Sequence, residues 1–338
     1  MHAGSLDPES GIVFHIAMGQ GITRLAPSPT GALHLGNART FLVNYLLARK
    51  LHWRVLMRVE DLDHPRVKAG ADRQALEDLR WLGIEWEEPI VYQSARGGVY
   101  QAALRRLVAA GAAYPCSCSR KDAEQAGAAP HGDEADARKV YPGTCRGRWA
   151  SADEAAAKTH RPVAWRVRVD GEPITVEDRF AGPHIFDLQA TCGDFVVYRD
   201  PQSAAYQLAV VLDDAEAGVD QIVRGDDLLE SAARQIHLRR LLGLQRGSPE
   251  PTYWHLPLVV GSDGRRLAKR HGDTRLTYYR QLGASPQRVL GLLGYWSGLI
   301  DRRQEATLDE LLADFDLARI PHRQVVLTRQ DDEFLRGR

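Results

Sequence analysis

The stretch from Pro27 to Asn37, Pro-Ser-Pro-Thr-Gly-Ala-Leu-His-Leu-Gly-Asn, combines residues that suit phosphate binding. Its prolines and glycines favour a sharp turn between a strand and a helix, and Gly36 lets a ligand lie against the backbone. A helix that begins near Gly36 would offer free N–H groups and a positive dipole end to phosphate. His34 could donate to a developing negative charge there. The alternative is an ordinary turn that carries a surface histidine.

A second stretch, Gly-Arg-Arg-Leu-Ala-Lys-Arg, begins at Gly264 and places Lys269 in a flexible loop far downstream. A lysine in such a loop can neutralise phosphate charge during group transfer. Taken alone, this stretch is more often a solvated basic surface loop. Whether this stretch binds phosphate must therefore be judged together with the other motifs of the sequence.

Three of the four cysteines, Cys116, Cys118 and Cys145, fall within thirty residues, and Cys192 stands apart. In a reducing compartment such a cluster favours a metal over a disulfide. Three thiolates would supply three corners of a tetrahedral zinc site. The alternative is a set of plain buried thiols. Cys192 is expected to be a core residue.

The fourth zinc ligand stays open at this point. Tyr141, His131 and His160 all lie close enough along the chain. Tyrosine is a rare ligand, because the metal must lower its pKa from about 10. A local histidine such as His131 is therefore an alternative.

Strands and helices alternate around these residues, which favours a parallel sheet covered by helices. Residues Leu42, Tyr45, Leu46 and Arg49 recur at helical spacing after the first turn. The predicted strands are 22–26, 53–59, 165–169, 195–198, 221–224 and 254–260. The other predicted helices are 72–82, 99–110, 204–213, 228–242, 277–282, 286–297 and 308–315.

The alternation of strands and helices is interrupted between residues 114 and 190, which predicts an inserted domain that contains the cysteines. The expected order is a disordered leader (1–20), an α/β domain in two halves (21–113 and 191–262) around this insertion, and the lysine loop with a helical domain (263–338). The leader is a poor signal peptide because acidic residues and His15 interrupt it. We therefore expect a cytoplasmic protein.

The composition is that of an ordinary folded chain, with 338 residues, 44% hydrophobic and 26% charged. Lys plus Arg and Asp plus Glu number 44 each, so the formal net charge is zero and any basic surface must be local. No apolar run approaches the ~18 residues of a transmembrane helix. We expect neither a membrane nor an obligate protein partner.

The motifs together resemble a known family. Residues 30–36 and 267–270 resemble the two signature motifs of class I aminoacyl-tRNA synthetases, although Ala268 replaces a common serine. The flanking segments 24–31, 58–63, 206–214 and 223–228 resemble the glutamyl branch, and the resemblance extends from Ile22 to Leu299. It implies an α/β fold with a Rossmann-like parallel sheet, a zinc-bearing insertion and a small C-terminal helical domain.

The resemblance also implies roles for individual residues. Glutamate carries two carboxylates and one ammonium, which suit two arginines and one acid. The implied glutamate pocket contains Arg24, Ser28, Glu60, Tyr206 and Arg224. The implied ATP site contains His34, Gly36, Asn37 and Lys269, of which His34 and Lys269 stabilise the transition state, and Mg²⁺ would accompany ATP.

Two features favour the family's short branch, the glutamyl-queuosine tRNA(Asp) synthetases. Cys-x-Cys followed by Tyr-x-x-x-Cys resembles their insertion, in which Tyr141 would complete the zinc site. Only 40 residues follow Gly298, too few for a typical anticodon-reading domain.

The short branch implies that glutamate is activated without tRNA and passed to queuosine in the anticodon stem-loop of tRNA(Asp). The first alternative is a compact glutamyl-tRNA synthetase that charges tRNA(Glu), since the stretch Lys-Arg-His-Gly after Ala268 resembles that enzyme's loop. The second alternative is a non-catalytic, zinc-bearing RNA-binding protein on a synthetase scaffold. The intact motif residues argue against the latter.

Overall fold

The structure is a computed structural model that describes residues 21–63, 65–119, 121–123, 140–200, 203–247, 250–267 and 272–338. The predicted leader, Lys269 and His131 lie outside these residues. Within the part of the chain that is described, no helix combines the length and the apolar character needed to span a membrane.

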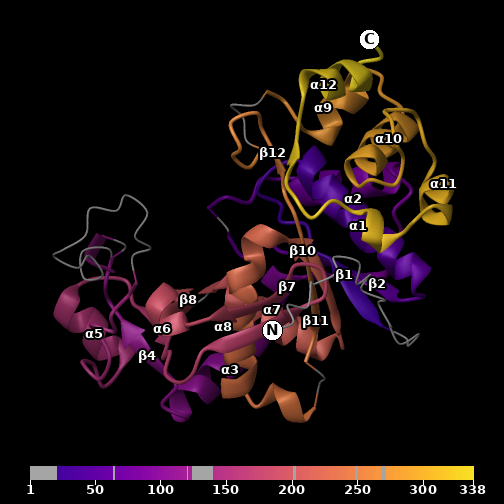
Figure 1. The fold of residues 1–338 in the computed structure, drawn as a ribbon. Coiled ribbons are helices and arrows are strands. Elements are labelled where there is room, and N and C mark those ends of the chain that lie inside the picture. Colours follow the sequence, from indigo (N-terminus) through magenta and orange to yellow (C-terminus); the bar gives the residue numbers. More distant parts are fainter. Residues whose placement is uncertain are drawn as a thin grey trace, which may run out of the picture.

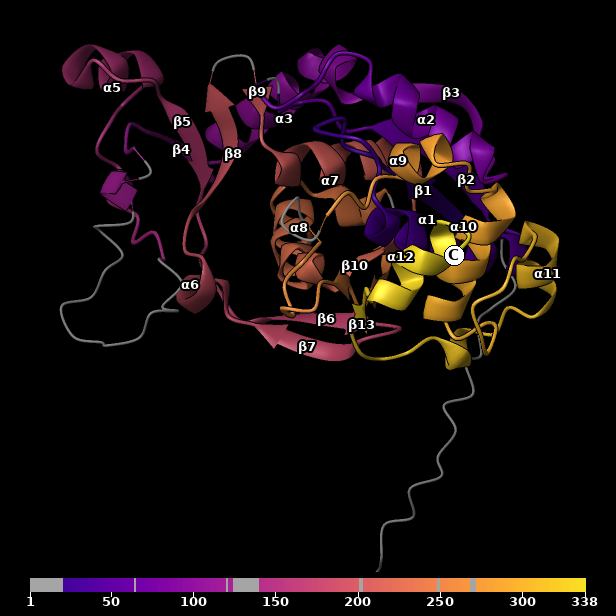
Figure 2. The ribbon, with the colours of Figure 1, turned by 90° about the horizontal axis from the view of Figure 1, so that it is seen from above.

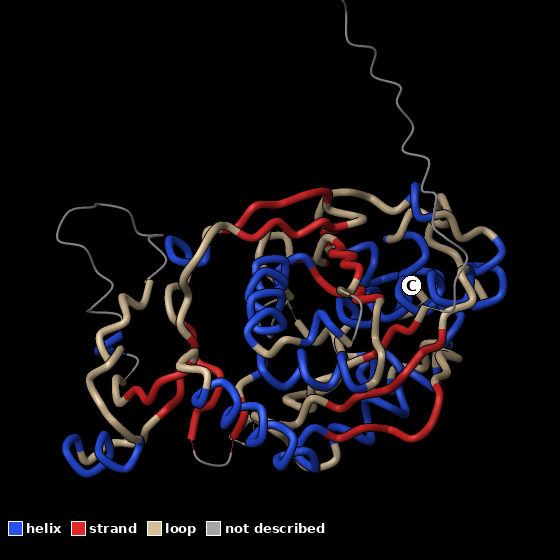
Figure 3. The backbone as a smooth tube through the Cα atoms, turned by 90° about the horizontal axis from the view of Figure 1, so that it is seen from below, coloured by secondary structure: helices blue, strands red, loops and turns tan. Residues whose placement is uncertain are grey.

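A seven-stranded sheet forms the centre of the molecule (Figures 1 and 3). Neighbouring strands are parallel except the last pair, β6 and β7. The strands, in order across the sheet, are β3 (Glu87–Tyr92), β2 (Arg54–Val59), β1 (Ile22–Leu25), β10 (Gln221–Gly225), β11 (Thr252–Leu256), β6 (Ile174–Asp178) and β7 (Gly182–Phe186). The predicted parallel sheet is confirmed.

Apolar side chains alternate between two cores, one on each face of this sheet. In β2, Val55 and Met57 belong to the first core, whereas Leu56 packs against the second. Helices α1 (Leu35–Lys50) and α2 (Ala71–Trp81) contribute to the first core. Helices α3 (Gly97–Ala109), α7 (Tyr206–Glu216) and α8 (Leu229–Leu241) contribute to the second.

The C-terminal helices extend the first core. Helices α9 (Leu276–Gln281), α10 (Pro286–Trp296), α11 (Leu308–Ala313) and α12 (Arg329–Leu335) supply apolar residues to it. Strand β13 (Val325–Val326) pairs with β12 (Val259–Val260), which follows β11 closely. The C-terminal segment is therefore joined to the chain that leads into the lysine loop.

A second sheet forms the insertion, which Figure 2 shows on the side of the molecule opposite the C-terminal helices. Its strands are β4 (Ala113–Cys116), β5 (Ala164–Val167), β8 (Phe195–Asp200) and β9 (Ser203–Ala204). Two short helices accompany it, α5 (Ala152–Thr159) and α6 (Leu188–Thr191).

Strand pairing crosses the predicted domain boundaries. β6 and β7 lie within 114–190 but pair with the central sheet, whereas β8 and β9 follow residue 190 but pair with the insertion. Alternating hydrophobicity identifies a strand without identifying its neighbour, because pairing depends on residues distant in the sequence. The domain boundaries themselves stay a prediction.

Candidate active site

A cavity of about 160 Å³ opens beside the carboxyl ends of β1 and β10. The chain continues from β1 to β2 on one side and from β10 to β11 on the other, so the strand order reverses between β1 and β10. Such a switch point leaves a crevice between the loops, where α/β sheets commonly bind ligands. Among the expected residues, the cavity lining includes Arg24, His34, Gly36, Asn37, Glu60, Tyr206 and Arg224.

Buried ion pairs hold one end of this cavity. Arg58 on β2 lies 3.0 Å from Glu60 through Nη2 and Oε1, and its Nη1 donates to Asp214. Asp214 is also 3.4 Å from Nε of Arg24. Burial raises the pKa of Glu60, and the charges of Arg58 and Arg24 counter part of this effect. The acids are therefore paired before any ligand enters.

This end of the cavity carries charges of both signs. Arg24, Arg58 and Arg224 lie with the carboxylates of Glu60 and Asp214, and Nε of Arg58 is also 4.0 Å from Asp213. Of these residues, Arg24, Arg224 and Glu60 line the cavity, so two cations and one acid suit the two carboxylates and one ammonium of free glutamate. Tyr206, at the start of α7, lines the same end. Burial and the charge of Glu60 raise the pKa of Tyr206, which keeps its hydroxyl neutral.

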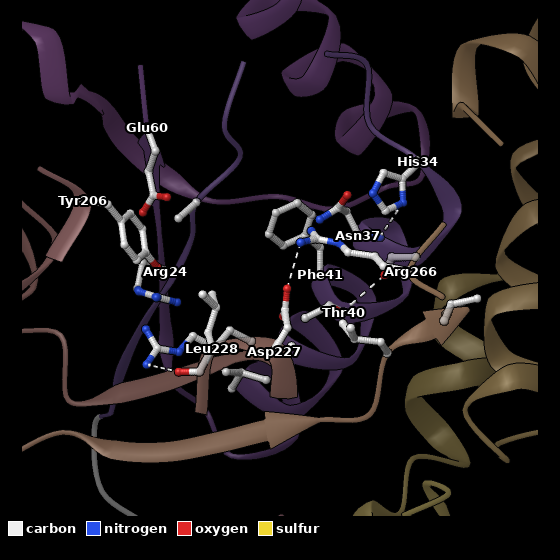
Figure 4. A pocket seen from close by; sticks show the side chains of 17 residues that line it. Arg24, His34, Asn37, Thr40, Phe41, Glu60, Tyr206, Asp227, Leu228 and Arg266 are labelled. Carbon is white, nitrogen blue, oxygen red and sulfur yellow. Dashed lines mark hydrogen bonds and ion pairs between the residues drawn. The ribbon is translucent and has the colours of Figure 1, made fainter. Parts of the chain in front are cut away.

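His34 and the first turn of α1 form the other end of the cavity. Figure 4 shows Arg24, Glu60 and Tyr206 gathered at one end, with His34 and Asn37 at the other. His34 is the N-cap of α1, and its Nδ1 accepts a hydrogen bond from the Asn37 N–H at 3.4 Å. Its remaining ring nitrogen, Nε2, therefore carries the proton and can donate.

The His34 ring is neutral at physiological pH. Burial and the nearby charge of Arg266 lower its pKa to about 4. A Cβ on Gly36 would approach Cε1 and Nδ1 of this ring to 3.2 Å, which explains the glycine. Arg266 forms an ion pair of 2.8 Å with Asp227 across the same cavity (Figure 4). This end thus offers a neutral donor, a helix N-terminus and a cation, which suits phosphate.

Ser28 lies outside this cavity lining. Ser28 is exposed, lines an adjoining cavity and donates to the Glu60 carbonyl at 3.2 Å. Lys269 lies outside the described residues, but the chain on its C-terminal side is fixed beside the histidine motif. There, Leu35 donates to the Thr274 carbonyl at 2.9 Å and Leu276 donates to that of Leu33 at 2.9 Å.

The three expected cysteines come together in the insertion. The sulphur atoms of Cys116, Cys118 and Cys145 all lie within 4.8 Å of one another. Tyr141 Oη lies 3.3 Å from the Cys116 sulphur and 3.6 Å from that of Cys118, and it accepts from the Cys145 N–H at 3.1 Å. Burial would raise the pKa of Cys145, but hydrogen bonds, chiefly with Tyr141, lower it to about 7.

Neighbouring residues fix this cluster. The Arg166 guanidinium lies 3.7 Å from the centre of the Tyr141 ring, and its Nε donates to the Cys116 sulphur at 3.4 Å. Gly193 is required because a Cβ there would lie 2.1 Å from the Tyr141 carbonyl oxygen. His160 is exposed at the end of α5 and is not part of the sulphur cluster.

Cys192 lies outside the cluster as expected and packs, half-buried, against the second core. The sequence patterns did not identify Arg58 and Asp214 as site residues, although both lie within segments that resemble the family. They also missed Arg166. No sequence spacing indicates these pairings, because they join residues up to 156 positions apart.

Known proteins resemble this chain over most of its length. The family model for the catalytic domain of class I tRNA synthetases (E and Q) matches residues 22–329. The glutamyl-Q tRNA(Asp) synthetase of Rhodopirellula baltica is 44% identical over 324 residues, covering 91% of this chain and 96% of that relative. The enzyme of the same name from Nocardia farcinica is 46% identical over 309 residues, covering 91% and 93%.

A solved structure shares the fold. The glutamate tRNA ligase of Elizabethkingia meningosepticum superimposes with a TM-score of 0.75 at 22% identity, covering 94% of this chain and 69% of that one. The predicted class I synthetase fold and the predicted family are thus confirmed. The chain belongs to the class I tRNA synthetases (E and Q), in the family of the glutamyl-Q tRNA(Asp) synthetases, and is an ATP-dependent ligase.

Proposed function

We propose that this ligase activates glutamate with ATP in the absence of tRNA and then transfers glutamate to queuosine in the anticodon loop of tRNA(Asp). The observation that carries the proposal is the single cavity that joins two complementary ends. One end matches the charges of glutamate and the other suits the phosphates of ATP. The names of the relatives from Rhodopirellula baltica and Nocardia farcinica support the same substrates.

In the first step, a glutamate carboxylate oxygen attacks the α-phosphorus of ATP. The bond to the bridging oxygen breaks and pyrophosphate leaves. Mg²⁺ would accompany ATP and would neutralise phosphate charge. Arg24, Arg224, Glu60 and Tyr206 hold the amino acid, while His34 Nε2 donates to the phosphate oxygens on which charge develops. Lys269 supplies further positive charge in the transition state. The enzyme needs no covalent intermediate of its own.

In the second step, a queuosine hydroxyl attacks the carbonyl carbon of the adenylate, and AMP leaves. Sequence-specific RNA recognition commonly takes unpaired loop bases that can be splayed out of the stem. The open cavity would receive such a base beside the adenylate. We propose this base, and not the 3′ end, as the acceptor, in line with the names of the relatives.

We also propose a structural zinc ion held by Cys116, Cys118, Cys145 and Tyr141. In a tetrahedral zinc site the ligand atoms lie about 3.5–3.8 Å apart. The distances of 3.3 and 3.6 Å from Tyr141 Oη, and of 3.5 Å between the Cys118 and Cys145 sulphurs, are close to these values. The cluster belongs to the insertion and the cavity to the central sheet, so the metal would stabilise the insertion without taking part in the chemistry.

The deciding experiment compares three RNA acceptors with radiolabelled glutamate. A tRNA(Asp) anticodon stem-loop that bears queuosine should be glutamylated, and the same loop with guanine should not. Esterification of the 3′ end of tRNA(Glu) would instead indicate a compact glutamyl-tRNA synthetase. ATP–pyrophosphate exchange that depends on glutamate, without RNA, tests the first step, and its absence would favour a non-catalytic RNA-binding role.

A further inference from the structure

Behind Arg224, buried polar side chains connect three neighbouring strands. Arg224 on β10 and His255 on β11 are partners in the parallel register, and β6, the next strand, ends at Asp178. Nε of Arg224 lies 2.9 Å from Nε2 of His255, and Nδ1 of His255 lies 2.5 Å from Oδ2 of Asp178. The side chains of His255 and Asp178 are wholly buried.

This geometry determines where the imidazole proton lies. A guanidinium N–H can only donate, so His255 Nε2 must accept from Arg224. The proton of the ring is then on Nδ1 and is donated to Asp178. Burial would raise the pKa of Asp178, but hydrogen bonds, chiefly from His255, lower it, so the acceptor is a carboxylate. Burial lowers the pKa of His255, which favours the neutral ring.

The second oxygen of Asp178 anchors the whole arrangement. Oδ1 accepts the N–H groups of Phe180 at 2.9 Å and Ala181 at 2.7 Å, in the turn that follows β6. The His255 N–H also contacts both carboxylate oxygens, at 3.1 and 3.2 Å. The carboxylate therefore cannot rotate without breaking several backbone hydrogen bonds.

Arg224 itself is held at all three nitrogens. Nε donates to His255, Nη1 donates to Gln235 Oε1 at 3.0 Å, and Nη2 donates to the Leu228 carbonyl at 3.2 Å. A guanidinium has five N–H groups, so these bonds leave one on each Nη nitrogen. Gln235 is fixed in turn by a bond of 2.9 Å to Gln207. Two donors on adjacent nitrogens match the two oxygens of a carboxylate.

We propose that His255 and Asp178 are positioning residues that orient Arg224 for a carboxylate of the substrate. This inference rests on the proposed function, in which Arg224 binds glutamate. Without the acceptor at His255 Nε2, the guanidinium can turn about its long side chain and its two remaining N–H groups lose their alignment. Glutamate must then order the arginine on binding, which lowers its affinity.

Two substitutions of His255 separate orientation from packing. His255→Asn keeps a donor toward Asp178 but has no acceptor that reaches Arg224, whereas His255→Gln places an amide oxygen near the position of Nε2. In ATP–pyrophosphate exchange, we expect His255→Asn to raise KM for glutamate about tenfold, as for loss of one charge-assisted hydrogen bond. KM for ATP and kcat should stay near the parent values, and His255→Gln should restore KM for glutamate.

His184→Asn on β7 is the matched control, because this half-buried histidine contacts the Gly182 carbonyl and the Phe186 ring and does not line the cavity. It should leave all three constants unchanged. An unchanged KM for glutamate in His255→Asn would overturn the proposal. An equal rise of KM for glutamate in both His255 variants, together with a higher KM for ATP, would also overturn the proposal, because that pattern indicates that His255 contributes packing alone.

The proton position gives a test that needs no substrate. Nitrogen NMR of the free protein should show His255 protonated at Nδ1 and unprotonated at Nε2, with the signal assigned by its loss in His255→Gln. A proton on Nε2 would overturn the positioning role whatever the substrate is. If the parent protein has this tautomer but shows no glutamate-dependent ATP–pyrophosphate exchange, the hydrogen bonds from Arg224 to Asp178 stand and the proposed function is refuted.

Discussion

The cavity and the cysteine cluster both gather polar groups away from water, but different interactions keep them in place. In the cavity, Arg24 and Arg58 are already paired with Asp214 between two large cores. Among the described residues, the cysteine cluster belongs to a small core of four buried residues, Tyr114, Cys116, Tyr141 and Cys145, with Cys118, Ala123 and Trp149 packed against it. Ion pairs between protein side chains hold the first site. In the second site, cysteine sulphur atoms occupy the centre, where a larger domain would have closely packed apolar side chains. A metal is therefore expected to matter for the stability of one site and not for the other.

Loss of a cysteine should produce the largest effect and test this contrast directly. A structural zinc site contributes about 10–16 kcal/mol over four ligands, so Cys145→Ser should weaken zinc binding by about 10²- to 10³-fold. Elemental analysis and zinc titration measure this, and the melting temperature should fall by several degrees. Glutamate-dependent exchange should stay within about twofold of the parent below that temperature. If the parent protein is purified without chelator and contains no zinc, the proposed metal site is refuted.

Lys269→Ala should lower the rate of exchange by about 10²–10³-fold, because the lysine acts on charge that is present mainly in the transition state. Glutamate binding and zinc content should hardly change. Steady-state exchange and calorimetric titration with glutamate measure the two effects. A higher KM for glutamate with intact turnover would show that the role assigned to Lys269 is wrong.

Arg224→Ala should raise KM for glutamate about 10- to 150-fold, since a buried, charge-assisted pair contributes about 1.5–3 kcal/mol. Arg24→Ala should act in the same direction, with an added loss of stability because Asp214 loses one partner. Arg105→Ala, at an exposed position on α3, is the control. Unchanged glutamate kinetics in both pocket variants would refute the pocket.

Arg166→Met should weaken zinc binding about tenfold, in the range found for groups that contact metal ligands. The guanidinium lies over the Tyr141 ring and donates to Cys116, so it offsets negative charge on both. Arg148→Met is the matched control, because Arg148 lies over Trp149 at 4.6 Å. Equal zinc affinity in the two variants would show that Arg166 only packs.

The smallest effect concerns a buried acid whose hydrogen-bond partner among the described residues is an amide, not an arginine. Asp78 on α2 is wholly buried, bonds Gln74 at 3.1 Å and has no hydrogen-bond partner for Oδ2 among the described residues. Burial raises its pKa to about 6. The folded state therefore holds the proton more tightly than the unfolded state, and stability should rise as pH falls from about 6 to about 4.

Asp78→Asn should remove this pH dependence. Above pH 6 the variant should be more stable than the parent by about 1 kcal/mol in urea unfolding, and the difference should vanish near pH 4. Glu77→Gln, at an exposed neighbouring position, is the control. Equal stability of parent and Asp78→Asn at neutral pH would mean that the acid is solvated, and the contrast with the paired acids of the cavity would disappear.

The sequence by itself determined the kind of fold and the residues nearest the chemistry. Hydrophobic periodicity predicted α7, α8 and β10 within a few residues, because each depends on neighbours along the chain. The motif around His34 predicted a helix N-terminus, and His34 is its N-cap. The spacing of Cys116, Cys118 and Cys145 predicted a cluster that the fold brings together.

Only the tertiary structure decided which groups hold these residues. Asp178 and His255 are 77 residues apart and meet because β6 lies beside β11, although the predicted boundaries placed residues 174–178 in the insertion. Arg58 meets Asp214 across 156 residues. Strand order depends on how all the apolar faces pack at once, and local pattern carries no information about it. The sequence therefore identified the groups that face the ligands, and the fold selected the partners that orient them.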